Sequence, residues 1–265
     1  MNTPLAVLAA LLSVLALYLP TRTQAFTRVM VDGRSVRMLV AGRGDATVVF
    51  ENGLGGPLEH WGKVQPDVSR FARTVTYDRA GLGLSEDGPP PRDGRRIAAE
   101  LRRALLSAGI TPPYIIVGAS LGGPYIRIFA GMYPDDVAGM VLVDPTPDSA
   151  RVDDAAGLPE LESLPNTLDQ ARASHVPSGI PLFLIDAVSP EEVPFATESI
   201  RTLRMNSRRE TETESREYRR WLDGIPGSRL VITNRSGHNV AQEQPELVVA
   251  TIRQVVDEAT RRSQR

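Results

Sequence analysis

The chain has 265 residues, of which 42% are hydrophobic and 5% aromatic, so it is long enough to bury one large core. Its net charge of −2 gives no field that would attract nucleic acid, and we predict no nucleic-acid partner. Zero cysteines exclude thiol catalysis and disulfides, and three scattered histidines argue against zinc, so we expect no metal and no cofactor.

Residues 1–25 form a segment of their own. Residues 5–19 are apolar apart from Ser13. This run is short for a membrane span of about 20 residues and lies at the long end of the range for the apolar core of a signal peptide. The sequence TQA at residues 23–25 fits a cleavage site, although no Lys or Arg precedes the apolar run. We predict a signal peptide or a membrane anchor, with a packed helix as the third alternative. The protein is then exported or associated with a membrane through residues 5–19, and a folded domain follows at residues 26–265.

Eight short runs of apolar and β-branched residues predict strands. They lie at residues 28–31, 36–40, 47–51, 73–77, 114–118, 139–143, 181–185 and 229–233. Helical patterns alternate with them from about residue 125, and residues 97–108 predict an amphipathic helix with arginines on its outer face. Strands alternating with helices predict an α/β fold, a mostly parallel eight-stranded sheet flanked by helices.

The sequence NGLGG at residues 52–56 follows the predicted strand 47–51. Glycines let the main chain approach a ligand closely, so the N–H of Leu54 is a candidate donor to an oxyanion. An ordinary glycine-rich turn would show the same pattern.

The sequence GASLG at residues 118–122 lies between a predicted strand and a predicted helix. Strand, sharp turn and helix are the setting of a nucleophile elbow, in which Ser120 is held exposed in a strained backbone conformation. Side chains at positions 118 and 122 would collide across such a turn. We predict Ser120 as the nucleophile and the N–H of Leu121 as the second oxyanion donor.

A serine nucleophile needs a base, and His238 is the best placed of the three histidines. It lies in a loop after the predicted strand 229–233, at the same edge of the sheet as Ser120. His60, beside Trp61, suits the rim of a pocket, and His175 falls in a loop region.

Two strand ends offer the acid that would orient His238. Asp144 directly follows the strand 139–143, and Asp186 follows the strand 181–185. We favour Asp144, because it comes straight off a core strand; Asp186 is the alternative, followed by Glu191 and Glu192. An Asp-Pro pair is also a common strand-end cap.

Two further stretches are interpreted from composition. Residues 146–180 interrupt the strand and helix rhythm with prolines and acids, which predicts a short cap. Residues 198–223 mix Arg and Glu at helical spacing and most simply form a solvated helix face.

Together these motifs resemble the α/β-hydrolase superfamily, in its esterase and lipase-like branch, over residues 32–256. The specific pieces are ENGLGG at 51–56, YDRAGLGLS at 77–85, the elbow, VLVDP at 141–145 and SGH at 236–238. The resemblance implies that residues 77–85 are a structural loop, so Ser85 is no nucleophile, and that the acid follows the sixth strand as Asp144-Pro145. Members usually carry His where this chain has Asn52 and Ala119, departures that bear on substrate fit.

The resemblance implies a serine hydrolase that cleaves carboxylic esters through an acyl-enzyme. Epoxide hydrolases and haloalkane dehalogenases of the superfamily need an aspartate at the elbow, so Ser120 excludes them. The alternatives are a cofactor-free perhydrolase or lyase on the same triad, and a binding protein that kept the fold. A short acidic cap and the apolar Leu54 favour a small or medium uncharged ester, although arginines such as Arg127 and Arg201 also suit a carboxylate-bearing substrate.

Overall fold

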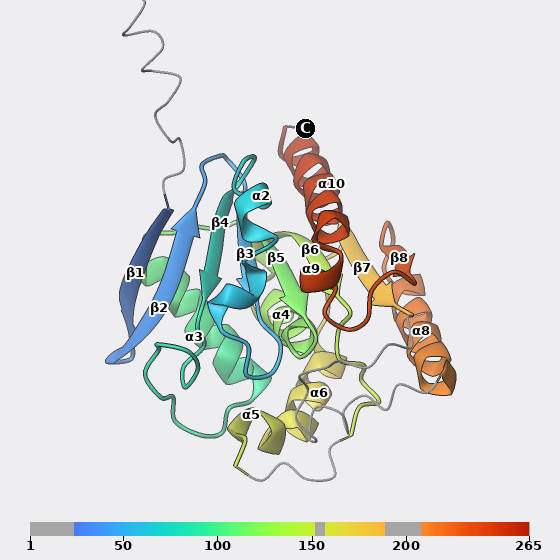
Figure 1. The fold of residues 1–265 in the computed structure, drawn as a ribbon, viewed down its shortest axis with the longest axis horizontal. Helices are drawn as coiled ribbons and strands as arrows, with labels where there is room; N and C mark the ends of the chain where they lie inside the picture. Colours follow the sequence, from blue (N-terminus) through green and yellow to red (C-terminus); the bar gives the residue numbers. More distant parts are fainter. Residues whose placement is uncertain (1–23, 152–156, 189–207, 265) are drawn as a thin grey trace, which may run out of the picture.

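The computed structural model describes residues 24–151, 157–188 and 208–264. In these ranges eight strands form one sheet in the order β1-β2-β4-β3-β5-β6-β7-β8 (Figure 1). β1 pairs antiparallel with β2, β2 pairs antiparallel with β4, and the remaining neighbours are parallel. The predicted fold class, a mostly parallel α/β sheet, is confirmed.

Every predicted strand is present. The strands are β1 (Gln24–Val31), β2 (Arg34–Ala41), β3 (Thr47–Glu51), β4 (Arg73–Tyr77), β5 (Tyr114–Ala119), β6 (Val137–Val143), β7 (Leu182–Ala187) and β8 (Arg229–Thr233). The largest difference is at β1, which begins at Gln24 rather than at residue 28, because its backbone pairing with β2 continues as far as Ala41.

Helices connect and cover these strands. They are α2 (Gln65–Val68), α3 (Gly94–Ser107), α4 (Gly122–Met132), α5 (Pro159–Glu162), α6 (Leu164–Ala173), α8 (Arg208–Asp223), α9 (Val240–Glu243) and α10 (Pro245–Ser263), with 3-10 turns η1 (Leu58–Trp61) and η2 (Pro134–Asp136). The predicted amphipathic helix is α3, which begins after Asp93, whose carboxylate accepts the N–H of Arg96 at 3.0 Å.

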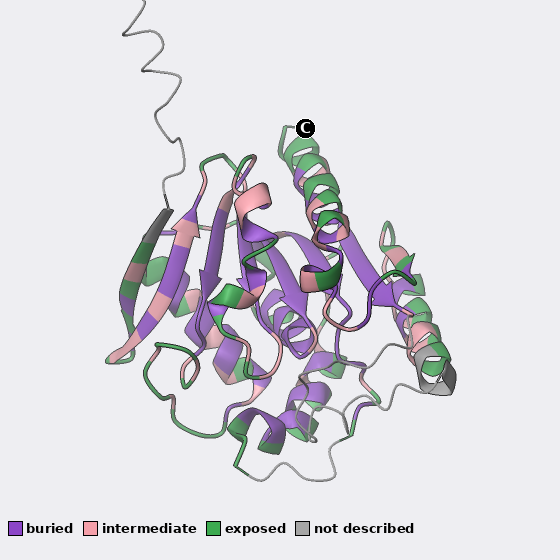
Figure 2. Cartoon of the chain, in the orientation of Figure 1, coloured by how far each residue is buried: buried purple, intermediate pink, exposed green. Residues whose placement is uncertain are grey.

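The sheet separates two hydrophobic cores, because successive side chains of a strand point to opposite faces. Val49 of β3 and Ile116 of β5 pack with α3 and α4, whereas Val48 and Ile115 pack with α2 and α10. The central strands are buried along their length (Figure 2). This burial holds the carboxyl ends of β3, β5 and β6 in fixed relative positions.

Two short helices, α5 and α6, occupy the region predicted to form the cap, and they lie beyond the carboxyl ends of the parallel strands (Figure 1). The helix predicted at residues 198–223 is α8 in its described part, and it is only partly solvated. It buries Tyr218 and Leu222 in the core that contains residues of α3 and α4. The first ten residues of that prediction, 198–207, lie outside the described residues.

Residues 1–23, which include the predicted signal peptide or anchor, also lie outside the described residues, and the domain boundary at residue 26 stays a prediction. Among the helices that the structure describes, none has both the length and the apolar character needed to cross a membrane.

Candidate active site

Ser120 occupies the sharp turn between β5 and α4, with φ at 51°, in the left-handed region that non-glycine residues rarely adopt. Its N–H donates to the carbonyl of Val143 at 3.1 Å. A Cβ on Gly118 would lie 2.5 Å from the carbonyl oxygen of Gly122, and a Cβ on Gly122 would lie 2.6 Å from that of Glu51. Both glycines are therefore required by the turn that presents Ser120.

The structure brings Ser120, His238 and Asp144 together in one hydrogen-bonded series. His238 Nε2 lies 2.9 Å from Ser120 Oγ, and His238 Nδ1 lies 2.8 Å from Asp144 Oδ2. With the proton on Nδ1, His238 donates to Asp144 and accepts the hydroxyl of Ser120. This is the arrangement in which an imidazole serves as base toward a serine hydroxyl.

Asp144 is fully buried at the end of β6 and has φ at 44°. Its own N–H donates to the carbonyl of Ile185 at 2.7 Å, and its Oδ1 accepts the N–H of Ala187 at 3.3 Å. The carboxylate is therefore oriented from β7 while it faces His238.

The alternative acid, Asp186, is placed differently. It is 2% exposed, and its carboxylate accepts a hydrogen bond from the hydroxyl of Ser215 on α8. Glu191 and Glu192 lie outside the described residues. Asp144 is thus the carboxylate that the structure places against His238 Nδ1.

The loop that carries His238 is held by Glu243 of α9, a residue that sequence analysis missed. Its carboxylate accepts the N–H of Gly237 at 2.6 Å and the hydroxyl of Ser236 at 3.3 Å. A single acid at the end of a short helix carries no motif, so only the folded loop reveals this contact.

The two predicted oxyanion donors belong to two segments that meet at Ser120. A Cβ on Gly53 would be 3.0 Å from Ser120 Cβ, so the loop of Leu54 passes directly beside the serine. Within the part of the chain that the structure describes, the N–H groups of Leu54 and Leu121 donate no hydrogen bond. The two side chains pack in a small apolar cluster with Tyr125 and with residues of the cap.

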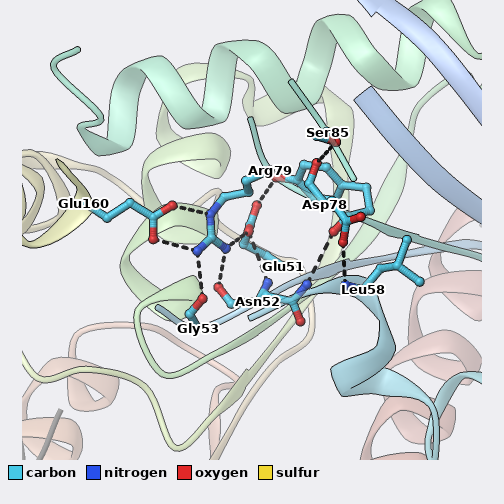
Figure 3. A network of polar contacts seen from close by, with 9 residues as sticks. Glu51, Asn52, Gly53, Leu58, Asp78, Arg79, Ser85 and Glu160 are labelled. Atoms are coloured by element: carbon cyan, nitrogen blue, oxygen red, sulfur yellow. Dashed lines mark hydrogen bonds and ion pairs between the residues drawn. The ribbon is translucent and has the colours of Figure 1, made fainter. Parts of the chain in front are cut away.

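Behind this loop, Arg79 is buried between two carboxylates (Figure 3). Its guanidinium binds Glu51 and both carboxylate oxygens of Glu160, and it also donates to the carbonyls of Asn52 and Gly53. Burial raises the pKa of Glu51, while the positive charge of Arg79 acts in the opposite direction.

Ser85 is structural, as the resemblance implied. Its hydroxyl donates to the carbonyl of Asp78 at 2.7 Å and accepts the N–H of Arg37 at 2.8 Å. The carboxylate of Asp78 in turn accepts the N–H of Leu58 at 2.8 Å (Figure 3). It also accepts the N–H of Leu84 at 3.0 Å, and the two bonds fix the loop after β4.

The other two histidines take no part in the series. His60 stacks edge-on against Trp61, and burial, assisted by the charge of His238, lowers its pKa. His175 is exposed after α6. No cluster of metal-ligating side chains occurs among the described residues.

Arg127, considered above as a contact for a carboxylate substrate, is paired within the protein. It donates to Asp148 at 2.7 and 3.1 Å and lies over the ring of Trp221. Arg201 lies outside the described residues.

Comparisons with known proteins agree with this fold. The family model described as "alpha/beta hydrolase fold" matches residues 46–226. The uncharacterized protein YqjL of Bacillus subtilis is 36% identical over 104 residues, which are 39% of this chain and 41% of that protein. Pyrrolizixenacetamide deacetylase of Xenorhabdus hominickii is 30% identical over 117 residues, or 44% of this chain and 43% of that protein.

Among solved structures, a thermophilic esterase from Thermogutta terrifontis has a TM-score of 0.60 and 19% identity, covering 91% of this chain and 99% of that one. The likeness to this esterase concerns the fold alone. The chain aligns with less than half the length of either sequence relative.

Proposed function

Because the chain belongs to the alpha/beta hydrolase fold family, we propose that it is a serine hydrolase that cleaves carboxylic esters through an acyl-enzyme. The observation that carries this proposal is the series from Ser120 Oγ through His238 to Asp144, with contacts of 2.9 and 2.8 Å. A positioned base next to a serine hydroxyl is what nucleophilic catalysis by serine requires.

In the first half-reaction Ser120 Oγ attacks the ester carbonyl while His238 Nε2 takes the hydroxyl proton. The tetrahedral intermediate then expels the alcohol, which receives that proton from His238. In the second half-reaction His238 takes a proton from water, the resulting hydroxide attacks the acyl-enzyme, and Ser120 leaves with the proton. In both half-reactions Asp144 keeps the proton of neutral His238 on Nδ1 and stabilises the imidazolium that forms.

The N–H groups of Leu54 and Leu121 serve as the oxyanion donors in this proposal. Gly53, the residue before Leu54, lies against Ser120, since an added Cβ would be 3.0 Å from Ser120 Cβ, and Leu121 follows the serine directly. Neither N–H donates elsewhere within the described residues, so both are available to a developing negative charge.

The substrate class is a small or medium uncharged ester. The apolar cluster beside Ser120 contains Leu121, Tyr125 and, from the cap, Leu164 and Leu168, with Leu54 packed against it. The engagement of Arg127 with Asp148 removes one arginine that would have favoured a carboxylate. A relative that is named a deacetylase is consistent with transfer of a small acyl group.

The test is labelling of the full chain with a fluorophosphonate probe, together with hydrolysis of p-nitrophenyl esters of graded acyl length. We expect labelling and hydrolysis that both disappear in Ser120→Ala, with a maximum at short acyl chains. Folded wild-type protein without Ser120-dependent labelling would instead be a binding protein that kept the fold.

Two further arms separate the alternative chemistries. Activity only with added peroxide would identify a perhydrolase, and cleavage whose products contain no oxygen from ¹⁸O-labelled water would identify a lyase. Faster cleavage of p-nitroacetanilide than of p-nitrophenyl acetate would move the proposal from esters to amides.

A further inference from the structure

We infer that Arg79 is a positioning residue for the oxyanion loop and that Glu160 makes this positioning depend on the cap. The inference deepens the proposed function and rests on it for its catalytic consequence. The buried guanidinium of Arg79 contacts two parts of the chain that are far apart in sequence, the oxyanion loop and α5 (Figure 3).

Arg79 uses all five of its N–H donors. Nη1 donates to Glu51 Oε1 at 2.7 Å and to the carbonyl of Asn52 at 2.6 Å. Nη2 donates to the carbonyl of Gly53 at 2.7 Å, and Nη2 and Nε bind the two oxygens of Glu160 at 2.8 Å each. At 1% exposure the guanidinium has no water to replace any of these partners.

Two of these bonds determine the orientation of consecutive peptide groups in the oxyanion loop. The carbonyl of Gly53 and the N–H of Leu54 belong to one trans peptide, so they point in opposite directions. A guanidinium that holds the carbonyl of Gly53 therefore directs the N–H of Leu54 away from itself. Gly53 also lies against Ser120, so the peptide group that carries this N–H is held next to the serine.

The remaining strong contact comes from the cap. Glu160 lies on α5, is 7% exposed, and binds Arg79 through a planar two-bond arrangement that a carboxylate is well suited to make. Glu51, on the other side, comes from β3 of the sheet. Arg79 thus connects a sheet strand, the oxyanion loop and the cap. A shift of α5 would therefore move the guanidinium that binds the loop carbonyls.

In Glu160→Gln the amide oxygen can accept only one of the two bonds from Arg79, and the amide NH2 group faces the other buried guanidinium donor. Arg79 is then less firmly held, which weakens its bonds to the carbonyls of Asn52 and Gly53. The carbonyl of Gly53 keeps only a longer bond, from the N–H of Gly56 at 3.3 Å. Because an oxyanion donor is worth about 10²- to 10³-fold in kcat, partial release of the Leu54 N–H should cost about 10- to 100-fold.

The test compares Glu160→Gln with Glu162→Gln, its neighbour on the same helix, which is exposed. With p-nitrophenyl acetate we expect Glu160→Gln to lower kcat by about 10- to 100-fold with KM within about twofold. The affinity for an aryl boronic acid, which forms a tetrahedral adduct with serine, should fall by the same factor. Glu162→Gln should match wild type.

A readout independent of turnover is the ¹⁵N order parameter of the Leu54 N–H. We expect it to fall from about 0.85 toward about 0.6 in Glu160→Gln, and to stay unchanged in Glu162→Gln. If wild type shows no Ser120-dependent hydrolysis, the proposed function fails while this measurement still decides the positioning role.

Folded Glu160→Gln with wild-type kcat and a rigid Leu54 N–H would overturn the inference, and so would a change confined to KM. Should Glu160→Gln not fold, Glu160→Asp keeps the charge but is one methylene too short for both contacts. In that variant, kcat and the order parameter of the Leu54 N–H then decide whether Glu160 positions the loop.

Discussion

Ser120 and Asp144 are joined through the backbone as well as through His238. The N–H of Ser120 donates to the carbonyl of Val143, the residue before Asp144, and the N–H of Thr146 donates to the carbonyl of Ser120 at 2.9 Å. Both residues have left-handed backbone conformations, with φ at 51° and 44°. The two strained turns therefore support one another, and the pairing of β5 with β6 determines the separation of nucleophile and acid.

Asp144→Asn should lower kcat by about 10⁴-fold, because an amide cannot hold His238 in the required tautomer. Asp186→Asn should have a much smaller effect, since Asp186 contacts Ser215 rather than His238. Steady-state kinetics with an activated ester measures kcat of both variants, and thermal unfolding checks that both are folded. The reverse order of effects would assign the acid to the end of β7.

Gly122→Ala should destabilise the fold by about 3 kcal/mol, because the added Cβ would lie 2.6 and 2.8 Å from the carbonyl oxygens of Glu51 and Asn52. Gly224→Ala is the matched control, since its nearest neighbour would be the carbonyl oxygen of Trp221 at 3.5 Å. Urea unfolding measures both. Equal stability of the two variants would show that the elbow can relax.

Glu243→Gln should lower the free energy of unfolding by about 1 kcal/mol, because it weakens a charge-assisted bond to the N–H of Gly237. The loss of orientation of His238 should lower kcat by about tenfold. Glu246→Gln, an exposed acid on the next helix, is the control. A stability loss without any change in kcat would limit Glu243 to holding the loop.

Acid should destabilise the protein partly through His60. Its pKa is lowered in the folded state, so below the ordinary value of about 6.5 the unfolded chain binds a proton that the folded chain resists. The stability present above that pH is lost as the pH falls toward the lowered pKa. His60→Gln should therefore flatten the fall in the free energy of unfolding between about pH 7 and 5. The exposed His175→Gln is the control, and equal slopes in both would contradict the prediction.

The N-terminal prediction is tested by the mass of the expressed protein. A cleaved signal peptide gives a mature chain that begins near residue 26, whereas an anchor leaves residues 5–19 in the membrane fraction. Full-length chain in the soluble cytosolic fraction would contradict both.

The centre of the sheet was predictable because β3, β5, β6 and β7 are mostly apolar runs, which buried parallel strands require. The elbow was predictable for a second reason, since Gly118 and Gly122 are demanded by the backbone around Ser120 whatever the substrate. Asp144 and Asp186 could not be separated by pattern alone, because both end core strands and are buried. The difference lies in which carboxylate faces His238, and that depends on three-dimensional packing.

The contacts of Glu160 and Glu243 had no sequence signal. Each lies on a four-residue helix without a motif. Glu160 binds a residue that is distant in sequence, and Glu243 binds the backbone of a nearby turn. Arg79 stood inside a recognised motif, but composition suggests a solvated side chain for arginine. Its burial follows from two carboxylates that meet only after folding.

Placement of the acid candidate at the end of β6 assigns the hydrogen-bonded series to two parts of the chain. Ser120 and Asp144 directly follow β5 and β6, which pair with each other, whereas His238 follows β8. A chain cut after β7 therefore contains the nucleophile and the acid but lacks the base, and a second fragment that carries β8, α9 and α10 would have to supply it.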